Sequence, residues 1–225
     1  MAFTGFGPGA VTFYEELAAD NSRDWWLAHR DRYETEVRAP LEHLLADLAP
    51  EFGEARVFRP NRDVRFSADK SPYKSNAAAA IDAAREVGSS LYVQLSADGL
   101  MTGSGLFHPA RDQLVKLREA IADDRTGTEL EAVLTGLRVA GATIEASDAL
   151  TTAPRGYPRD HPRIELLRMK GIIGTISHRP APWLHTPKAR EVVADDWRTL
   201  HPLHTWLERH VGASHLPAEV RGGRR

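Results

Sequence analysis

The chain has 225 residues, of which 42% are hydrophobic and 27% charged, and its formal net charge at pH 7 is −2. These ordinary values predict one domain over residues 1–220, followed by a disordered basic tail over residues 221–225. Because the chain has no cysteine, disulfides, thiolate metal sites and thiol nucleophiles are excluded, and the near-zero net charge disfavours non-specific coating of nucleic acid.

The first residues show no basic stretch followed by an apolar one, which is the pattern of a secretory signal. No run approaches the roughly 18 apolar residues that a membrane span needs. We therefore expect a cytoplasmic protein with no membrane partner.

Helices are predicted at the start of the chain. The first covers residues 11–18, and Asn21 or Ser22 is expected to cap a second that runs to about Arg38. Its residues Trp26, Tyr33 and Val37 recur at helical spacing on one face. A third helix is expected from Pro40, with a leucine stripe at Leu41, Leu44, Leu45 and Leu48.

The middle of the chain has the alternation of strands. If residues 57–66 are extended, Arg59, Asp63 and Arg65 share one face, and Arg62 falls on the apolar face, where it must be paired or turned outward by a bulge. Residues 89–107 predict a hairpin that turns at Asp98-Gly99. Its glycines at 103 and 105 indicate a sheet position that requires small residues.

Further helices are expected over residues 110–122 and 127–137, and short strands over residues 142–146 and 171–178. Asp160 is a candidate N-cap for a helix that runs through Leu167 to Lys170. Pro202 is expected to kink or split the last helix. Helices, then an antiparallel sheet, then helices predict an α+β fold, in which helices from the N-terminal and C-terminal thirds pack on a central, mainly antiparallel sheet.

The segment of residues 59–76 stands out because five cationic side chains share it with only two carboxylates, Asp63 and Asp69. Its net charge is +3 within a chain of net charge −2, and such crowded cations repel one another unless an acidic group lies between them. The functional interpretation is an anion site. Its ligand-binding residues would be Arg59, Arg62, Arg65, Ser67, Lys70, Tyr73 and Lys74, joined by Arg155. The structural alternative is an internal lattice of ion pairs.

Two residues are candidates for acid–base catalysis. Asp63 lies among the cations, and His161 stands in Asp160-His161-Pro162, where its imidazole titrates in the useful range. The structural alternative is that Asp160 caps a helix and His161 is a partly buried polar residue. The histidines at 201, 204, 210 and 215 have no supporting carboxylate pattern, so neither a metal site nor a cofactor is expected.

Three motifs occur in a characteristic order, namely Asn21-Ser-Arg-Asp-Trp-Trp26, the cationic run from Arg59 to Lys74, and Pro154-Arg-Gly-Tyr-x-x-Asp-His-Pro162. Together they resemble the family called domain of unknown function 2461, over nearly the whole chain. Trp26 and Ser75 stand where the family pattern usually has Phe and Thr. The resemblance implies no particular activity, cofactor or catalytic residue.

The leading functional hypothesis is therefore a basic pocket that binds a small phosphorylated or polycarboxylate ligand. One alternative is a hydrolase or transferase acting on a phosphorylated substrate, with Asp63 or His161 as the acid–base group. Another is sequence-tolerant binding of single-stranded nucleic acid, with Tyr73 and Tyr92 as stacking groups. The sequence does not predict an oligomeric state.

Overall fold

The structure is a computed structural model that describes residues 2–65, 68–81 and 89–216. It divides into two compact units, each made of three segments of the chain. The first unit comprises Met1–Ile81, Tyr92–Thr102 and Ser177–Asp195, and the second comprises Asp82–Leu91, Gly103–Ile176 and Asp196–Arg225. The predicted basic tail over residues 221–225 lies outside the described residues.

Within the described range, six strands form one mainly antiparallel sheet in the order β1-β2-β3-β4-β6-β5. The strands are β1 (Arg56–Val57), β2 (Asn76–Ile81), β3 (Ser90–Ser96), β4 (Gly99–Leu106), β5 (Thr143–Glu145) and β6 (Ile172–His178). Helices from both the N-terminal and the C-terminal regions accompany this sheet, so the predicted α+β fold is confirmed.

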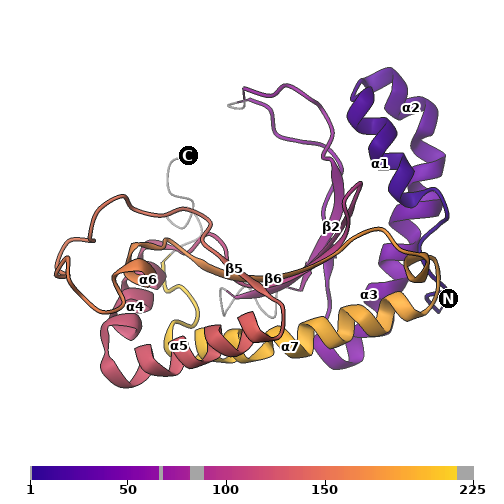
Figure 1. The fold of residues 1–225 in the computed structure, drawn as a ribbon. Helices are drawn as coiled ribbons and strands as arrows, with labels where there is room; N and C mark the ends of the chain where they lie inside the picture. Colours follow the sequence, from indigo (N-terminus) through magenta and orange to yellow (C-terminus); the bar gives the residue numbers. More distant parts are fainter. Residues whose placement is uncertain (1, 66–67, 82–88, 217–225) are drawn as a thin grey trace. The chain divides into compact units, whose positions relative to one another are not determined.

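The first unit opens with a nearly continuous helical region, which is visible beside β2 in Figure 1. It consists of α1 (Ala10–Ala19), α2 (Arg23–Arg32), the π-helical turn η1 (Tyr33–Arg38) and α3 (Ala39–Phe52). Ser22 caps α2 as predicted, because its hydroxyl accepts the backbone N–H of Trp25 at 3.2 Å. The predicted boundary near Arg38 is instead a π-helical stretch that leads directly into α3.

The apolar stripes of these helices form the core of the first unit. Trp26, Tyr33 and Val37 are all buried, as their spacing predicts, and the leucine stripe of α3 is buried as well. Phe13 of α1 completes the cluster, with its ring centroid 5.7 Å from that of Trp26 and 5.8 Å from that of Tyr33. Aromatic packing therefore fixes the helices that later position the candidate site.

The predicted strand over residues 57–66 is wrong, because β1 ends at Val57. The chain then makes one isolated bridge, Asn61 with Tyr73, and is irregular on either side of it. Pro60 has no N–H to donate to a ladder, although its carbonyl accepts the N–H of Lys74 at 2.8 Å. The cationic segment is therefore a loop between β1 and β2 instead of one face of a strand.

The predicted hairpin is confirmed, but its turn lies one residue earlier than expected. Ala97 and Asp98 form the turn, and Gly99 opens β4 with a φ of +105°. The expected need for small residues also holds. A Cβ at Gly105, whose φ is +149°, would lie 2.2 Å from the carbonyl oxygen of Ile172 in β6.

The second unit contains α4 (Arg111–Ala122), α5 (Asp124–Val139) and the short α6 (Ile164–Arg168). Its core gathers leucines of α4 and α5 with Leu167, Ile172, Leu200 and Trp206. The predicted cap at Asp160 is wrong, because α6 begins at Ile164 and Arg163 occupies the N-cap position. The sequence between Pro158 and Arg163 instead forms turns.

The last elements are the 3₁₀ turn η2 (Pro182–His185) and the helix α7 (Lys188–His210). Pro202 lies inside α7 and does not split it, contrary to one of the two expected outcomes. Across the parts of the chain that the structure describes, no helix is both long and apolar enough to cross a bilayer.

Candidate functional site

The cationic loop is closed by backbone hydrogen bonds between its two ends. The N–H of Phe58 donates to the carbonyl of Ala78 at 2.8 Å, and the N–H of Arg62 donates to the carbonyl of Pro72 at 2.9 Å. With the bond from Lys74 to Pro60, these contacts bring the start and the end of the motif side by side. The cations nearest these ends, at 56, 59, 62 and 74, therefore belong to one region of the first unit.

The motif at the start of α2 anchors this loop. The side-chain amide of Asn21 donates to the carbonyl of Tyr73 at 3.0 Å and accepts the N–H of Tyr73 at 3.1 Å. The rings of Trp26 and Tyr73 stack with centroids 4.2 Å apart and planes 10° apart. Two of the three sequence motifs are therefore one structural element, in which Asn21 binds the backbone and Trp26 the ring of the same tyrosine.

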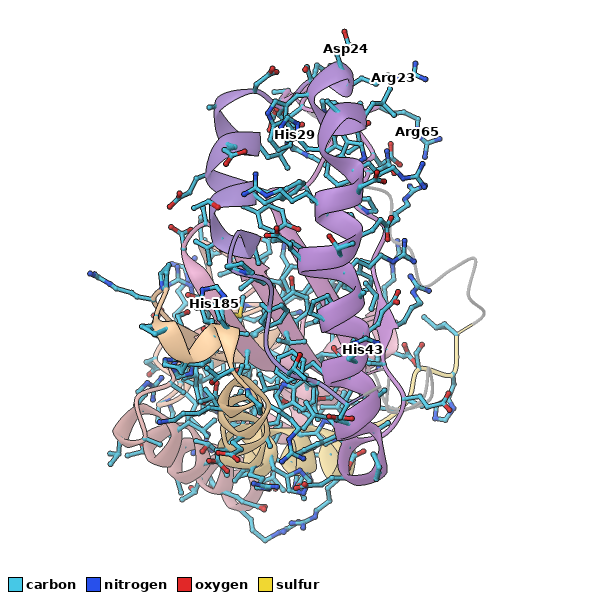
Figure 2. The ribbon with its side chains drawn as sticks, turned by 90° about the vertical axis from the view of Figure 1, so that its right-hand side faces the viewer. Arg23, Asp24, His29, His43, Arg65 and His185 are labelled. Atoms are coloured by element: carbon cyan, nitrogen blue, oxygen red, sulfur yellow. The ribbon has the colours of Figure 1, made fainter. Side chains whose placement is uncertain are left out.

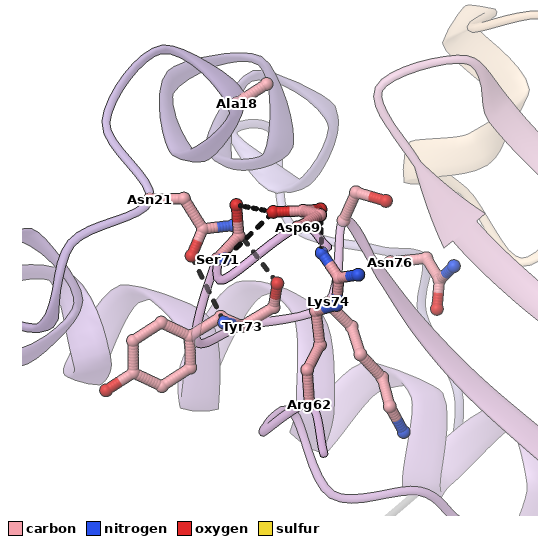
Figure 3. A pocket seen from close by; sticks show the side chains of 9 residues that line it. Ala18, Asn21, Arg62, Asp69, Ser71, Tyr73, Lys74 and Asn76 are labelled. Carbon is pink, nitrogen blue, oxygen red and sulfur yellow. Dashed lines mark hydrogen bonds and ion pairs between the residues drawn. The ribbon is translucent and has the colours of Figure 1, made fainter. Parts of the chain in front are cut away.

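Part of the cationic segment is an ion-pair lattice. Arg62 pairs with Asp69, which also accepts the N–H and the hydroxyl of Ser71 at 2.9 and 2.7 Å (Figure 3). The hydroxyl of Ser71, then the guanidinium of Arg62 and the Ser71 amide, hold the pKa of Asp69 far below its usual range. Arg62 is thus paired, although it lies in a loop and not on the apolar face of the expected strand.

Arg65 and Lys70 also find partners within the loop. Arg65 makes a two-pronged contact with Asp63, at 2.9 Å from Nε and 2.7 Å from Nη2, although its side chain is 77% exposed and extends outward from the ribbon (Figure 2). The ammonium of Lys70 donates to the carbonyl of Val64 at 3.0 Å. Asp63 is therefore a counter-charge of Arg65, which weakens its candidacy as an acid–base group.

Two further cations lie beside the ring of Phe58, and a third, Arg59, acts on Lys74 through its charge. The Lys74 ammonium lies 5.3 Å from the ring centroid of Phe58, and the guanidinium carbon of Arg56 lies 5.7 Å from it. Burial first, then the charges of Arg59 and Arg56, lower the pKa of Lys74. Among the described residues, no carboxylate forms an ion pair with Arg56, Arg59 or Lys74. We call these three residues the Phe58 cation cluster.

A pocket of about 480 Å³ adjoins this cluster (Figure 3). Lys74 belongs to both, and the other polar groups in the pocket wall are amides, hydroxyls and the Arg62–Asp69 pair. The lining residues are Ala18, Asn21, Arg62, Asp69, Ser71, Tyr73, Lys74, Ser75 and Asn76. The pocket is thus a polar cavity with one half-buried ammonium and one carboxylate already neutralised by its partner.

The structure brings some of the predicted site residues together and separates others from the pocket. Arg62, Tyr73 and Lys74 line it, whereas Arg59, Arg65 and Lys70 do not, and Ser67 lies outside the described residues. Tyr73 is only 7% exposed, and its ring is stacked on Trp26. The structure therefore supports a packing role for Tyr73 more than its predicted role as a hydroxyl donor to a ligand.

Arg155 and His161 belong to the second unit and do not line this pocket. Arg155 is exposed, and Nδ1 of His161 accepts the N–H of Arg163 at 3.0 Å. That contact gives His161 the local role of ordering the turn before α6. No group of three or more histidine or acidic residues in the described ranges is arranged to hold a metal ion.

Sequence reasoning missed three residues that the structure makes important, namely Asn21 as the clamp on Tyr73, Arg56 in the cation cluster, and the buried Arg163. Arg56 lies just outside the motif, so a window drawn slightly wider would have included it. Nothing local distinguishes Arg163, which is 6% exposed, from its neighbours Arg155 and Arg159. Its partners lie about 40 residues earlier in the chain.

Residues 9–206 match the model of a family described as conserved hypothetical protein (DUF2461). The chain belongs to this family. The match covers the three motifs that carry the resemblance and nearly the full length. No curated protein and no solved structure matches the chain.

Proposed function

We propose that the protein binds a small phosphorylated or polycarboxylate ligand at the Phe58 cation cluster and in the adjoining pocket. The observation that carries the proposal is the cluster itself. Burial first, and then the charges of Arg59 and Arg56, lower the pKa of Lys74, and no described carboxylate forms an ion pair with the three cations. An anion placed between them would relieve this repulsion and gain charge-assisted hydrogen bonds.

The pocket favours binding over turnover. Asp69 is the only carboxylate among the described residues of its lining, and the hydrogen bonds from Ser71 and Arg62 keep its pKa low, so it is a poor proton acceptor near neutral pH. No imidazole belongs to the described lining. The hydroxyls of Ser71 and Ser75 and the amide of Asn76 suit a polar, hydroxyl-bearing part of the ligand.

The test is calorimetric titration of the whole protein with phosphate, pyrophosphate and citrate, comparing Lys74→Gln with a matched control, Arg65→Gln. Each variant removes one cation, but the guanidinium of Arg65 is already held by Asp63. A hydrogen bond to a charged group contributes about 1.5–3 kcal/mol. We therefore expect Lys74→Gln to weaken binding of the preferred anion about 10- to 100-fold.

Arg65→Gln is expected to change the affinity less than about threefold, through the loss of general attraction alone. Equal weakening by both variants would mean that only the net charge matters. Absence of binding to all three anions by the unmodified protein would overturn the proposal.

A further inference from the structure

A buried serine–histidine contact lies in the second unit, and nothing in the proposed anion site uses it. Ser89 directly precedes β3, and His204 lies on α7, 115 residues later in the chain. The Ser89 hydroxyl oxygen is 2.9 Å from Nδ1 of His204. The two residues are only 3% and 6% exposed. Solvent therefore does not compete for this hydrogen bond.

Glu208 completes the arrangement one helical turn further along α7. Its Oε1 lies 3.2 Å from Nε2 of His204. An ionised carboxylate can only accept, so in the neutral ring the proton is held on Nε2, and Nδ1 keeps its lone pair. Ser89 must then be the donor to Nδ1. The carboxylate thus selects the tautomer in which the imidazole can take the serine proton.

The environment also keeps this ring neutral. Burial is the largest influence and lowers the pKa of His204, Glu208 raises it, and the charge of His201 lowers it again. His201 is the neighbouring ring, with its centroid 6.0 Å away. A neutral imidazole with a free lone pair on the serine side is the form that a general base requires.

We propose that Ser89, His204 and Glu208 form a nucleophilic relay that reacts with small activated acyl or sulfonyl groups. The oxygen of Ser89 bonds to the electrophilic atom as its proton passes to Nδ1 of His204, and the bond to the leaving group breaks. The imidazolium is stabilised by Glu208 and returns the proton to the leaving group or to solvent. Water then releases an acyl group by the reverse sequence.

The relay has the roles of a serine–histidine–acid triad, with the two ring nitrogens exchanged. Ser89 is only 3% exposed, so the proposal requires a small substrate, and the same burial protects the polarised contact from water. The relay does not depend on the anion site, since its three residues belong to the second unit. The competing explanation is a structural hydrogen bond that ties the start of β3 to α7.

Methanesulfonyl fluoride distinguishes the two explanations, because it is small and it transfers its sulfonyl group to an activated serine with loss of fluoride. The folded full-length protein is treated, digested and analysed by peptide mass spectrometry. Ser104 is an internal control, since it is 1% exposed and its hydroxyl has no hydrogen-bond partner in the described chain. Burial without activation predicts equal labelling of Ser89 and Ser104.

We expect Ser89 to be sulfonylated while Ser104 stays unmodified. His204→Gln should slow the reaction at least about 100-fold, the contribution typical of a general base, and Glu208→Gln should slow it to a smaller extent. Thermal melts establish that the variants fold. If His204→Gln fails to fold, the comparison of Ser89 with Ser104 and the effect of Glu208→Gln still distinguish the relay from a structural hydrogen bond. An unmodified Ser89, or a rate unchanged in either folded variant, overturns the relay.

Discussion

At the scale of single residues, Asn21 shows how a polar side chain can replace a strand partner. Its amide satisfies both the N–H and the carbonyl of Tyr73, across 52 residues of sequence. The loop that carries Lys74 next to Tyr73 has little regular structure of its own. The position of Lys74, and with it the proposed anion site, therefore depends on the hydrogen bonds that Asn21 makes to the backbone of Tyr73.

Asn21→Ala should lower the free energy of unfolding by about 2 kcal/mol, because two backbone groups of a buried residue lose their partner. Urea denaturation measures this. Asn61→Ala is the matched control. It also removes a side-chain amide, but from an exposed position in the loop that carries Tyr73 and Lys74. It should change the stability by less than about 0.5 kcal/mol. Equal effects of the two variants would contradict the role of Asn21.

Arg163 joins the end of α4 to the start of α5. Its guanidinium donates to the carbonyls of Ile121 at 2.7 Å and Ala122 at 3.2 Å, and it pairs with Asp124 at 2.9 Å. Gly127 makes room for it, since a Cβ there would lie 2.4 Å from Nε. These contacts satisfy carbonyls that the last turn of α4 leaves open.

Arg163→Ala should cost about 3 kcal/mol of stability, because several carbonyls lose their donor at once. Arg163→Lys should recover less than half of that, since one ammonium cannot reproduce the planar fork. Denaturant melts test both, with the exposed Arg159→Ala as the control. Full rescue by lysine would mean that charge alone matters.

At the scale of elements, the close approach of β4 and β6 depends on Gly105. Gly105→Ala should destabilise the protein by about 2–3 kcal/mol, because the new Cβ would lie 2.2 Å from the carbonyl oxygen of Ile172 at a strained φ. Gly136→Ala makes the same chemical change inside α5, where nothing lies within 4 Å. That control should instead stabilise by about 0.5–1 kcal/mol. Thermal and urea melts showing the same sign for both would refute this explanation.

The elements also show which sequence patterns are informative. Amphipathic helices and the hairpin were predictable, because their periodicity reports which face is buried. Strand β2 was missed, since the four alanines at residues 77–80 show neither alternation nor β-branching. The expected strand over residues 57–66 failed because β1 ends at Val57, and the chain beyond it is joined to the other end of the loop by the single bridge between Asn61 and Tyr73.

The candidate site was predictable as a charge pattern but not as a geometry. Strand alternation predicted that Arg59, Asp63 and Arg65 would share one face. In the structure Asp63 pairs with Arg65, whereas the charge of Arg59 acts on Lys74. Which cations are neutralised depends on how the loop folds back on itself. Composition predicts an excess of positive charge, and only the contacts assign that excess to the Phe58 cation cluster.

At the scale of the whole molecule, the two units carry different chemistry. The first holds the cation cluster and its pocket, and the second holds the serine–histidine contact together with the motif at residues 154–162. Where unfolding is cooperative, a single free energy of unfolding nevertheless includes the stability of both units. A titratable group buried in either unit therefore contributes to the pH dependence of global stability.

His204 gives this pH dependence a definite sign. Burial lowers its pKa below the ordinary value of 6.5, so the unfolded chain takes up the proton at a higher pH than the folded chain does. Above pH 6.5 the neutral ring makes its full contribution to the free energy of unfolding. That contribution is lost as the pH falls from 6.5 toward the lower pKa of His204 in the folded protein. A carboxylate with a depressed pKa, such as Asp69, loses its contribution only at much lower pH.

The measurement is the free energy of unfolding in urea at pH 8, 7, 6 and 5 for the unmodified protein and for His204→Gln. Groups common to both proteins cancel in the difference. The stability advantage of histidine over glutamine should be constant between pH 8 and pH 7 and should shrink steadily at pH 6 and pH 5, because only histidine gains a proton on unfolding. A difference that stays constant down to pH 5, or one that grows, would mean that His204 is not held neutral by its burial.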